Sequence, residues 1–346
     1  MTPPLSTRLQ WLGQHAWLHK SARTLLAVAP GLVFFVSTGE PRGVMFAFAA
    51  LCLSVPYGDR SFRPVHLAGC AVVSGLLMPA AVWLQYHPAL YVPVCAVAGV
   101  AHVLVSRSAI LPPRVPTWVL IYLLYESSEL HGEAWPTVVT AALLVAPAAL
   151  WVYVGCFYLW PWRGEETGGR AASTSALGMS VPVNAACAAL SMASAAAATF
   201  AFHLPHPNWA IWSALTVIRP ARVVSLRRAA ERLVGAGIGC AVGLGAVQAL
   251  SEVPFVLAAI TVVVVGFMVA FEQYTLAVAI RSALAPLAAF ALRGDALAAG
   301  QARFVCIFIG VAIGTTFMLL LSSDRVDNVS ERLLKRIGGG GVPRTR

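Results

Sequence analysis

Arg281 is the residue whose placement points most directly to chemistry. It lies midway along the apolar run between Glu272 and Arg293, and an arginine at membrane depth is costly unless it faces a cavity or a partner. Its position therefore predicts an anion-binding residue. An ion pair with Glu272 or Asp324 accounts for the same position equally well, and both interpretations stay open.

Three further arginines lie near the ends of apolar runs. Arg219, Arg232 and Arg303 are close enough to a polar boundary to reach lipid phosphates, which is the simpler account of them. If their helices face a transport pathway, they instead form a vestibule that concentrates anions by electrostatic attraction.

Aromatic residues accompany these arginines. Trp209, Trp212 and Tyr274 are able to stack on an aromatic substrate or on a guanidinium, although Trp and Tyr near span ends are usually interfacial. Trp212 lies one helical turn deeper than Trp209, so it is the better candidate for a pocket.

Proton coupling requires a titratable group within reach of the pathway. His102, Glu126, Glu129 and Glu272 are the candidates at membrane depth or at its boundary. A hydrogen-bonded packing role is the simpler account of His102, and hydration at the outer end of the fifth span explains Glu126 and Glu129. Glu272 and His102 are kept as the proton-coupling candidates.

Several other kinds of chemistry lack their sequence patterns. The chain has no G-x-x-x-x-G-K-[ST] loop, no H-E-x-x-H and no G-x-S-x-G. Its seven cysteines all lie in apolar runs and are never spaced C-x-x-C, so we interpret them as packing residues. We therefore expect no enzyme, no metal site and no cofactor.

Composition defines the elements that must position these residues. Hydrophobic residues make up 59% of the 346 and charged residues only 11%, so most side chains must face lipid or one another. The arginines recur in short clusters between apolar runs, which argues against nucleic acid as a partner despite the net charge of +10.

Apolar runs predict an all-α integral membrane protein with about twelve transmembrane helices. The predicted spans lie near 23–38, 42–57, 64–84, 88–105, 115–130, 136–160, 181–203, 207–220, 228–250, 254–271, 273–292 and 300–321. Basic residues gather in alternate connections, and cytoplasmic loops carry such an excess. We therefore expect both termini in the cytoplasm and no large soluble domain.

An internal echo predicts a duplication. The segment 38–60 resembles 204–220 in its order of polar turn, apolar run and basic turn, which predicts two parallel six-helix repeats with a pathway between them. The expected organisation is a cytoplasmic N-terminal segment (1–22), a first repeat (23–161), a cytoplasmic linker (162–180), a second repeat (181–321) and a cytoplasmic tail (322–346).

Small residues mark one helix of the second repeat. Gly235, Gly239 and Gly243 recur every four residues, and Gly310 and Gly314 repeat the spacing in the last span. This spacing lets helix backbones approach closely. Close packing without a ligand is the favoured interpretation of these glycines.

The stretch from about 180 to 320 resembles the fusaric-acid-resistance (FUSC) or aromatic acid exporter family. Trp212 and Thr216 match its Trp-x-x-x-Thr span, and Arg232 with Gly235 and Gly239 matches its Arg-x-x-Gly-x-x-x-Gly helix. Tyr274, Pro286 and Arg303 follow in the order of the rest of that repeat. The first half keeps only the outline of the pattern.

The resemblance implies a secondary transporter that exports organic, aromatic carboxylate anions across the bacterial inner membrane and is driven by the proton gradient. Its implied substrate-binding residues are Arg281, Trp212, Thr216, Tyr274, Arg219, Arg232 and Arg303. Partners to expect are the small organic anion, membrane lipid, a periplasmic adaptor and further copies of the chain. A passive anion channel and a structural platform for such an adaptor remain the alternatives.

Overall fold

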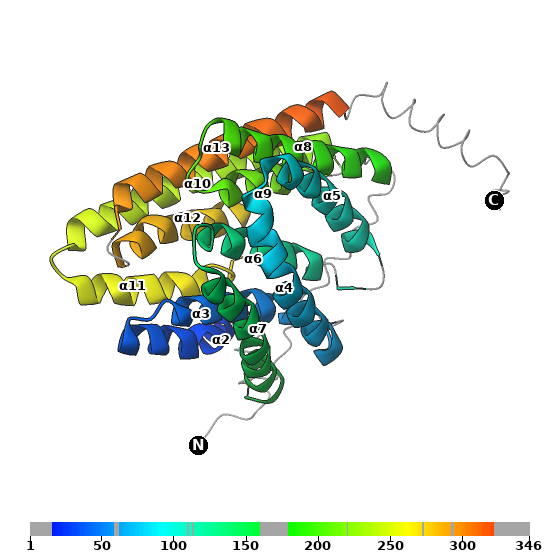
Figure 1. Ribbon diagram of the computed structural model, residues 1–346. Coiled ribbons are helices and arrows are strands. Elements are labelled where there is room, and N and C mark those ends of the chain that lie inside the picture. Colours follow the sequence, from blue (N-terminus) through cyan, green and yellow to red (C-terminus); the bar gives the residue numbers. More distant parts are fainter. Residues whose placement is uncertain are drawn as a thin grey trace, which may run out of the picture.

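The chain folds entirely into helices wherever its structure is described. The computed structural model describes residues 16–58, 62–108, 111–112, 114–159, 179–219, 221–271, 273–291 and 294–321. Twelve α-helices lie within these ranges (Figure 1). They are α2 (Ala16–Thr38), α3 (Arg42–Ser54), α4 (Pro64–Gln85), α5 (Pro88–Arg107), α6 (Val115–Glu129), α7 (Trp135–Val152), α8 (Val181–Ala201), α9 (Pro207–Val217), α10 (Arg222–Leu250), α11 (Pro254–Phe267), α12 (Tyr274–Ala291) and α13 (Ala296–Leu321), with the 3-10 helix η1 (Val55–Gly58) after α3 and the π-helix η2 (Tyr153–Leu159) after α7.

Length and hydropathy confirm a polytopic helical membrane protein. Within the described ranges, eight helices are long and apolar enough to cross a bilayer, and α3 and α11 are shorter apolar helices. Every predicted span coincides with a helix, but twelve complete crossings and two repeats stay predictions. The α9 helix has 11 residues and is about 16 Å long, roughly half of the hydrocarbon thickness.

The outer faces of the long helices are apolar, as a lipid environment requires. Leu76 on α4, Leu143 on α7 and Val242 on α10 are each more than 60% exposed. In water such contiguous apolar surface would drive association. In a bilayer the same surface faces the lipid chains. By contrast α9 is buried on almost every side, including its polar residues Asn208 and Ser213.

Glycines fix the direction of the helices around the second half. A Cβ atom added to Gly235 would lie 2.6 Å from the carbonyl oxygen of Thr275, and one added to Gly243 would lie 2.6 Å from that of Ala283. The contacted residue on α12 moves from Thr275 to Ala283 as the glycine on α10 moves from Gly235 to Gly243, so the two helices run parallel at close range. The space beside Gly314 of α13 is likewise filled by α9, because a Cβ atom added to this glycine would lie 2.6 Å from Cγ2 of Val217. The predicted packing role of these glycines is therefore what the structure shows.

The packing pairs recur between the two halves of the chain. The α3 helix packs against α7 as α9 packs against α13, and α4 packs against α6 and α7 as α10 packs against α12 and α13. Across the boundary, α5 packs against α8 and α2 against α11, and α2 and α11 lie side by side in Figure 1. A duplicated six-helix unit would produce this recurrence of packing pairs, so the recurrence supports the predicted duplication.

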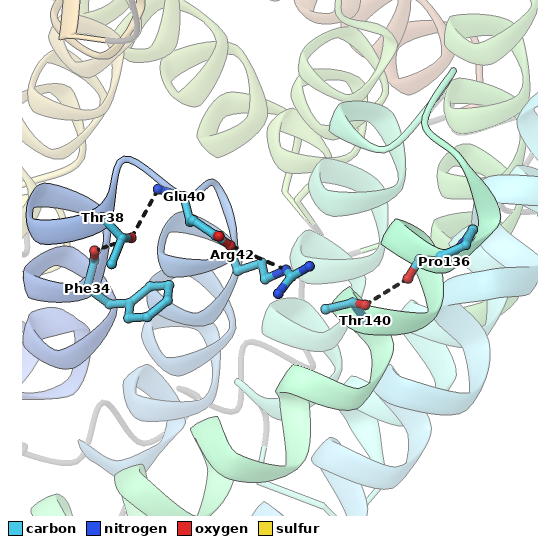
Figure 2. Close-up of polar contacts among 6 residues, drawn as sticks. All are labelled: Phe34, Thr38, Glu40, Arg42, Pro136 and Thr140. Carbon is cyan, nitrogen blue, oxygen red and sulfur yellow. Dashed lines mark hydrogen bonds and ion pairs between the residues drawn. The ribbon is translucent and has the colours of Figure 1, made fainter.

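The α2–α3 turn is held by side chains at its surface (Figure 2). The hydroxyl of Thr38 donates to the carbonyl of Phe34 at 2.7 Å and accepts from the amide of Glu40 at 3.1 Å. The carboxylate of Glu40 then lies 3.6 Å from Arg42. These contacts satisfy backbone groups that a helix end leaves unpaired.

Three predicted boundaries need comment. The first helix begins at Ala16 rather than at residue 23, so residues 16–22 of the predicted N-terminal segment are helical, and Arg23 is buried. Most of the predicted linker (162–178) and the whole tail (322–346) lie outside the described residues.

Candidate functional site

Arginines from four elements of the second half converge between α9, α10, α12 and α13. They form two clusters. The Tyr274 cluster contains Arg219, Arg228, Arg232, Thr216 and Tyr274. The Trp209 cluster contains Arg303, Trp209, Tyr125 and His206.

The Tyr274 cluster is built around one phenol ring at the start of α12. Arg232 of α10, only 4% exposed, donates through Nη1 to the Tyr274 hydroxyl at 2.9 Å. The guanidinium of Arg228, one turn earlier on α10, lies 3.5 Å from the centroid of the same ring. Arg219, in the connection between α9 and α10, interacts electrostatically with Arg228, Arg232 and Tyr274.

The Trp209 cluster joins the two halves of the chain. Arg303 of α13, only 7% exposed, donates through Nη1 to the hydroxyl of Tyr125 on α6 at 3.3 Å. Its guanidinium lies 4.6 Å from the centroid of the Trp209 ring. The other neighbour of that ring is His206, stacked at a centroid distance of 4.1 Å, whose Nδ1 is 3.7 Å from a carboxylate oxygen of Glu129.

Arg281 lies between the two clusters. Its Nε donates at 2.8 Å to the carbonyl of Met268, just past the end of α11. Carbonyls at a helix C-terminus lack intrahelical partners and carry partial negative charge, so this contact stabilises the guanidinium without neutralising it. Its charge interacts with Arg232 and Tyr274 of one cluster and with Arg303 and Tyr125 of the other.

Helix register gives the distance between the clusters. Phe304 meets Gly237, and Leu244 meets Gly300, so α13 runs antiparallel to α10 and Arg303 lies near the level of residue 238. Arg232 is then about 10 Å away along the bundle at 1.5 Å per residue. Together with Arg281, the arginines make a cationic path of that length inside the bundle.

Carboxylate partners are scarce along the described part of the path, where Arg228 of the Tyr274 cluster has Glu231 at 3.7 Å. Among the described residues, no carboxylate lies within ion-pair distance of Arg232, Arg281 or Arg303. The Nε atoms of Arg232 and Arg303 are buried without any hydrogen-bond partner in that part of the chain. Buried donors on a charged group are costly when unpaired, so the arrangement favours a bound anion that supplies the missing acceptors.

The predicted site residues are only partly brought together. Arg219, Arg232, Arg281, Arg303, Tyr274 and Thr216 belong to the path or its two clusters. Trp212 does not, since it packs with Ile211 and Leu215 in the main apolar core. The alternative ion pair of Arg281 with Glu272 or Asp324 involves residues outside the described ranges.

Of the two proton-coupling candidates, only His102 lies within the described residues. Glu272 is outside the described residues. His102 of α5 hydrogen-bonds through Nε2 to the Thr117 hydroxyl at 3.0 Å, and its Nδ1 is buried without a partner in the described chain. Arg219 interacts with it electrostatically, so His102 is close to the Tyr274 cluster.

Three participants were not predicted as site residues. Tyr125 and His206 belong to no recognised sequence motif, and the sequence marked Arg228 only as one member of the basic cluster from Arg219 to Arg232. Glu126 was expected to be hydrated, but it is 5% exposed. The adjacency of Tyr125 to two carboxyl residues was the one available signal, because polar residues at membrane depth mark functional sites.

His206 lies in the connection between α8 and α9. Burial lowers the pKa of His206, and the nearby charge of Arg303 lowers it further. The imidazole is therefore neutral at pH 7 and offers its face to Trp209 without competing for an anion.

The helices define a multi-pass membrane protein whose interior holds a group of arginines. Residues 192–339 match a family model described as fusaric acid resistance protein-like. The matched segment contains both arginine clusters except for Tyr125, so the resemblance seen in the sequence is confirmed for this part of the chain, and it indicates a membrane transport or efflux function. No curated protein and no solved structure matches the chain.

Proposed function

We propose that the chain transports organic carboxylate anions across the membrane along the path formed by Arg232, Arg281 and Arg303. The observation that carries the proposal is that these three arginines, from three helices, lie inside the bundle without a carboxylate partner among the described residues, Arg232 and Arg303 being buried and Arg281 partly exposed. Guanidinium groups bind carboxylates through paired, charge-assisted hydrogen bonds. Such a region is a place for an anion rather than for a cation.

Aromatic carboxylates fit the path best. Each cluster places an aromatic ring beside a guanidinium, Tyr274 beside Arg232 and Trp209 beside Arg303. A substrate ring that stacks there takes the place of the present neighbour of that ring, Arg228 or His206. A ring in the substrate gains from stacking on Trp or Tyr while its carboxylate meets the arginine. We propose aromatic acids as the main substrate class, exported from the cytoplasm across a bacterial inner membrane with both termini cytoplasmic.

The energy source separates a transporter from a channel. His102, close to Arg219 in the Tyr274 cluster, is the described candidate for proton coupling. Saturable benzoate uptake into proteoliposomes that stops when the pH gradient is collapsed would support a secondary transporter. Ohmic currents indifferent to that gradient would support a passive anion channel.

The test of the path is Arg281→Ala. We expect this variant to lose benzoate transport while it remains a monodisperse, folded membrane protein. Arg227→Ala is the matched control, because Arg227 is on the same basic helix as Arg232 but its side chain is 80% exposed. Unchanged transport by Arg281→Ala removes this residue from the path.

A further inference from the structure

A cavity lies between the two halves of the chain, where α8 turns into α9. Its volume is about 280 Å³, close to the lower end of the roughly 300–1,000 Å³ typical of small-molecule sites. Gln85, Ser128 and His131 of the first half line it on one side, and Thr199, His203 and Leu204 of the second half line it on the other.

The walls of the cavity continue into the Trp209 cluster. Ser128 lies three residues after Tyr125 on α6, and one helical turn separates such positions. Leu204 lines the cavity and also packs against the buried group formed by Trp209, Ala210 and Cys306, as Tyr125 does. The side chain of Leu204 therefore links the wall of the cavity to the Trp209 cluster.

Local backbone geometry holds Leu204 in that position. The amide of Leu204 donates to the carbonyl of Thr199 at 2.9 Å, closing the end of α8. The preceding residue, His203, has φ of +49°, a left-handed conformation that costs energy for any residue with a side chain. Residues held in such conformations gather at binding sites and switches.

The lining suits an aromatic carboxylate. None of the nine residues that line the cavity is acidic. The Ser128 hydroxyl and the rings of His131 and His203 are hydrogen-bonding groups for a carboxylate, and the ring of Phe200 supplies an apolar wall. This is the balance of apolar surface and a few polar groups that small-molecule sites show.

We propose that this cavity is a second station for the transported aromatic anion and that Leu204 is the gate between it and the Trp209 cluster. The proposal rests on the proposed transport function. An anion passing from Arg303 displaces the Leu204 side chain and enters the cavity, where hydrogen-bonding groups replace the guanidinium.

The gate is tested by Leu204→Trp. An indole at this position blocks the opening, so we expect benzoate transport to fall by about tenfold or more, because apolar constrictions control passage. The rise in melting temperature that benzoate produces in the detergent-purified protein should persist, since the Arg303 side remains intact. Leu190→Trp is the control, because Leu190 on α8 is 43% exposed. Transport by Leu204→Trp at the control rate overturns the gate.

A second measurement tests the cavity without altering the gate. All seven native cysteines are buried, so a membrane-impermeant thiol reagent reports on an introduced Ser128→Cys. We expect labelling of this variant and protection by benzoate. Absence of labelling, or labelling that benzoate does not slow, overturns the cavity as a station, including the case in which lipid fills it.

These outcomes are separable from those of the transport proposal. If the wild-type chain neither transports benzoate nor is stabilised by it, the transport proposal fails. If the wild type does both, but Leu204→Trp transports benzoate at the control rate and benzoate does not slow the labelling of Ser128→Cys, only the gate and the station fail.

Discussion

Arg303 is the residue on which two recognition surfaces depend. Its guanidinium faces the Trp209 ring at 4.6 Å and donates to Tyr125 at 3.3 Å, while its Nε has no partner within the described structure. A planar guanidinium is able to stack and to hydrogen-bond at once, which an ammonium cannot do.

We therefore expect Arg303→Lys to weaken anion binding despite keeping the charge. Loss of a charge-assisted hydrogen bond corresponds to about 1.5–3 kcal/mol, or roughly ten- to a hundredfold in affinity. The measurement is a benzoate titration followed by the melting temperature. Arg227→Lys on the exposed side of α10 should titrate as the wild type, and equal affinities for both variants would refute the role of the guanidinium plane.

His206 predicts a pH dependence of stability. Its pKa is below the ordinary value of 6.5 in the folded protein because of burial and Arg303. Below pH 6.5 the unfolded chain takes up a proton that the folded chain does not, so stability present above this pH is lost as the pH falls. We expect His206→Gln to flatten that part of the profile, measured as melting temperature from about pH 8 to about pH 5. A variant that loses stability on acidification as steeply as the wild type would contradict the assignment.

At the scale of elements, close helix pairs place the arginines. The α10–α12 contact depends on glycine because the space at Gly243 is filled by Ala283 and Pro286. Gly245, two residues later, has nothing within 4 Å of the position of a Cβ atom. The two glycines of one helix thus form a matched pair.

Gly243→Ala should destabilise the protein by about 1–3 kcal/mol, the usual cost of overpacking, and displace Arg232 from Tyr274. Gly245→Ala should leave stability unchanged or improve it slightly, because alanine favours the helix. Denaturation in detergent by circular dichroism measures both. Equal stabilities of the two variants would show that the backbone contact is not what limits this interface.

The helices were predictable from sequence, but the site was predictable only in part. Apolar runs located the helices because lipid leaves the chain no other way to satisfy its backbone, although α3 and α9 are shorter than the bilayer is thick. The arginines stood out because charge in such a run is costly. Tyr125 did not, since its contact with Arg303 spans 178 positions in the sequence. The surroundings of Trp212 were not predictable either, because the rotation of α9 about its axis is set by its neighbours.

At the scale of the whole molecule, the first half completes a site that the second half begins. The family match covers residues 192–339, yet Tyr125, Gln85 and Ser128 all come from outside it. The first half thus supplies one wall of the proposed pathway.

Tyr125→Phe tests that contribution. Removing the hydroxyl leaves Nη1 of Arg303 without its phenol partner, and we expect benzoate transport to fall by about fivefold to tenfold, the equivalent of roughly 1–1.5 kcal/mol. Tyr158→Phe is the control, because Tyr158 is 66% exposed on η2. Transport by Tyr125→Phe at the control rate would confine the pathway to the second half.

The brevity of α9 also constrains how the protein is made. At 11 residues it is too short to cross a bilayer alone, and its buried Asn208 and Ser213 need protein around them. Its partner α13, which receives it at Gly310 and Gly314, begins 79 residues after α9 ends (296 − 217). During synthesis α9 therefore packs fully only after α13 has been translated. A chain interrupted before α13 leaves α9 incompletely packed and exposed to proteolysis.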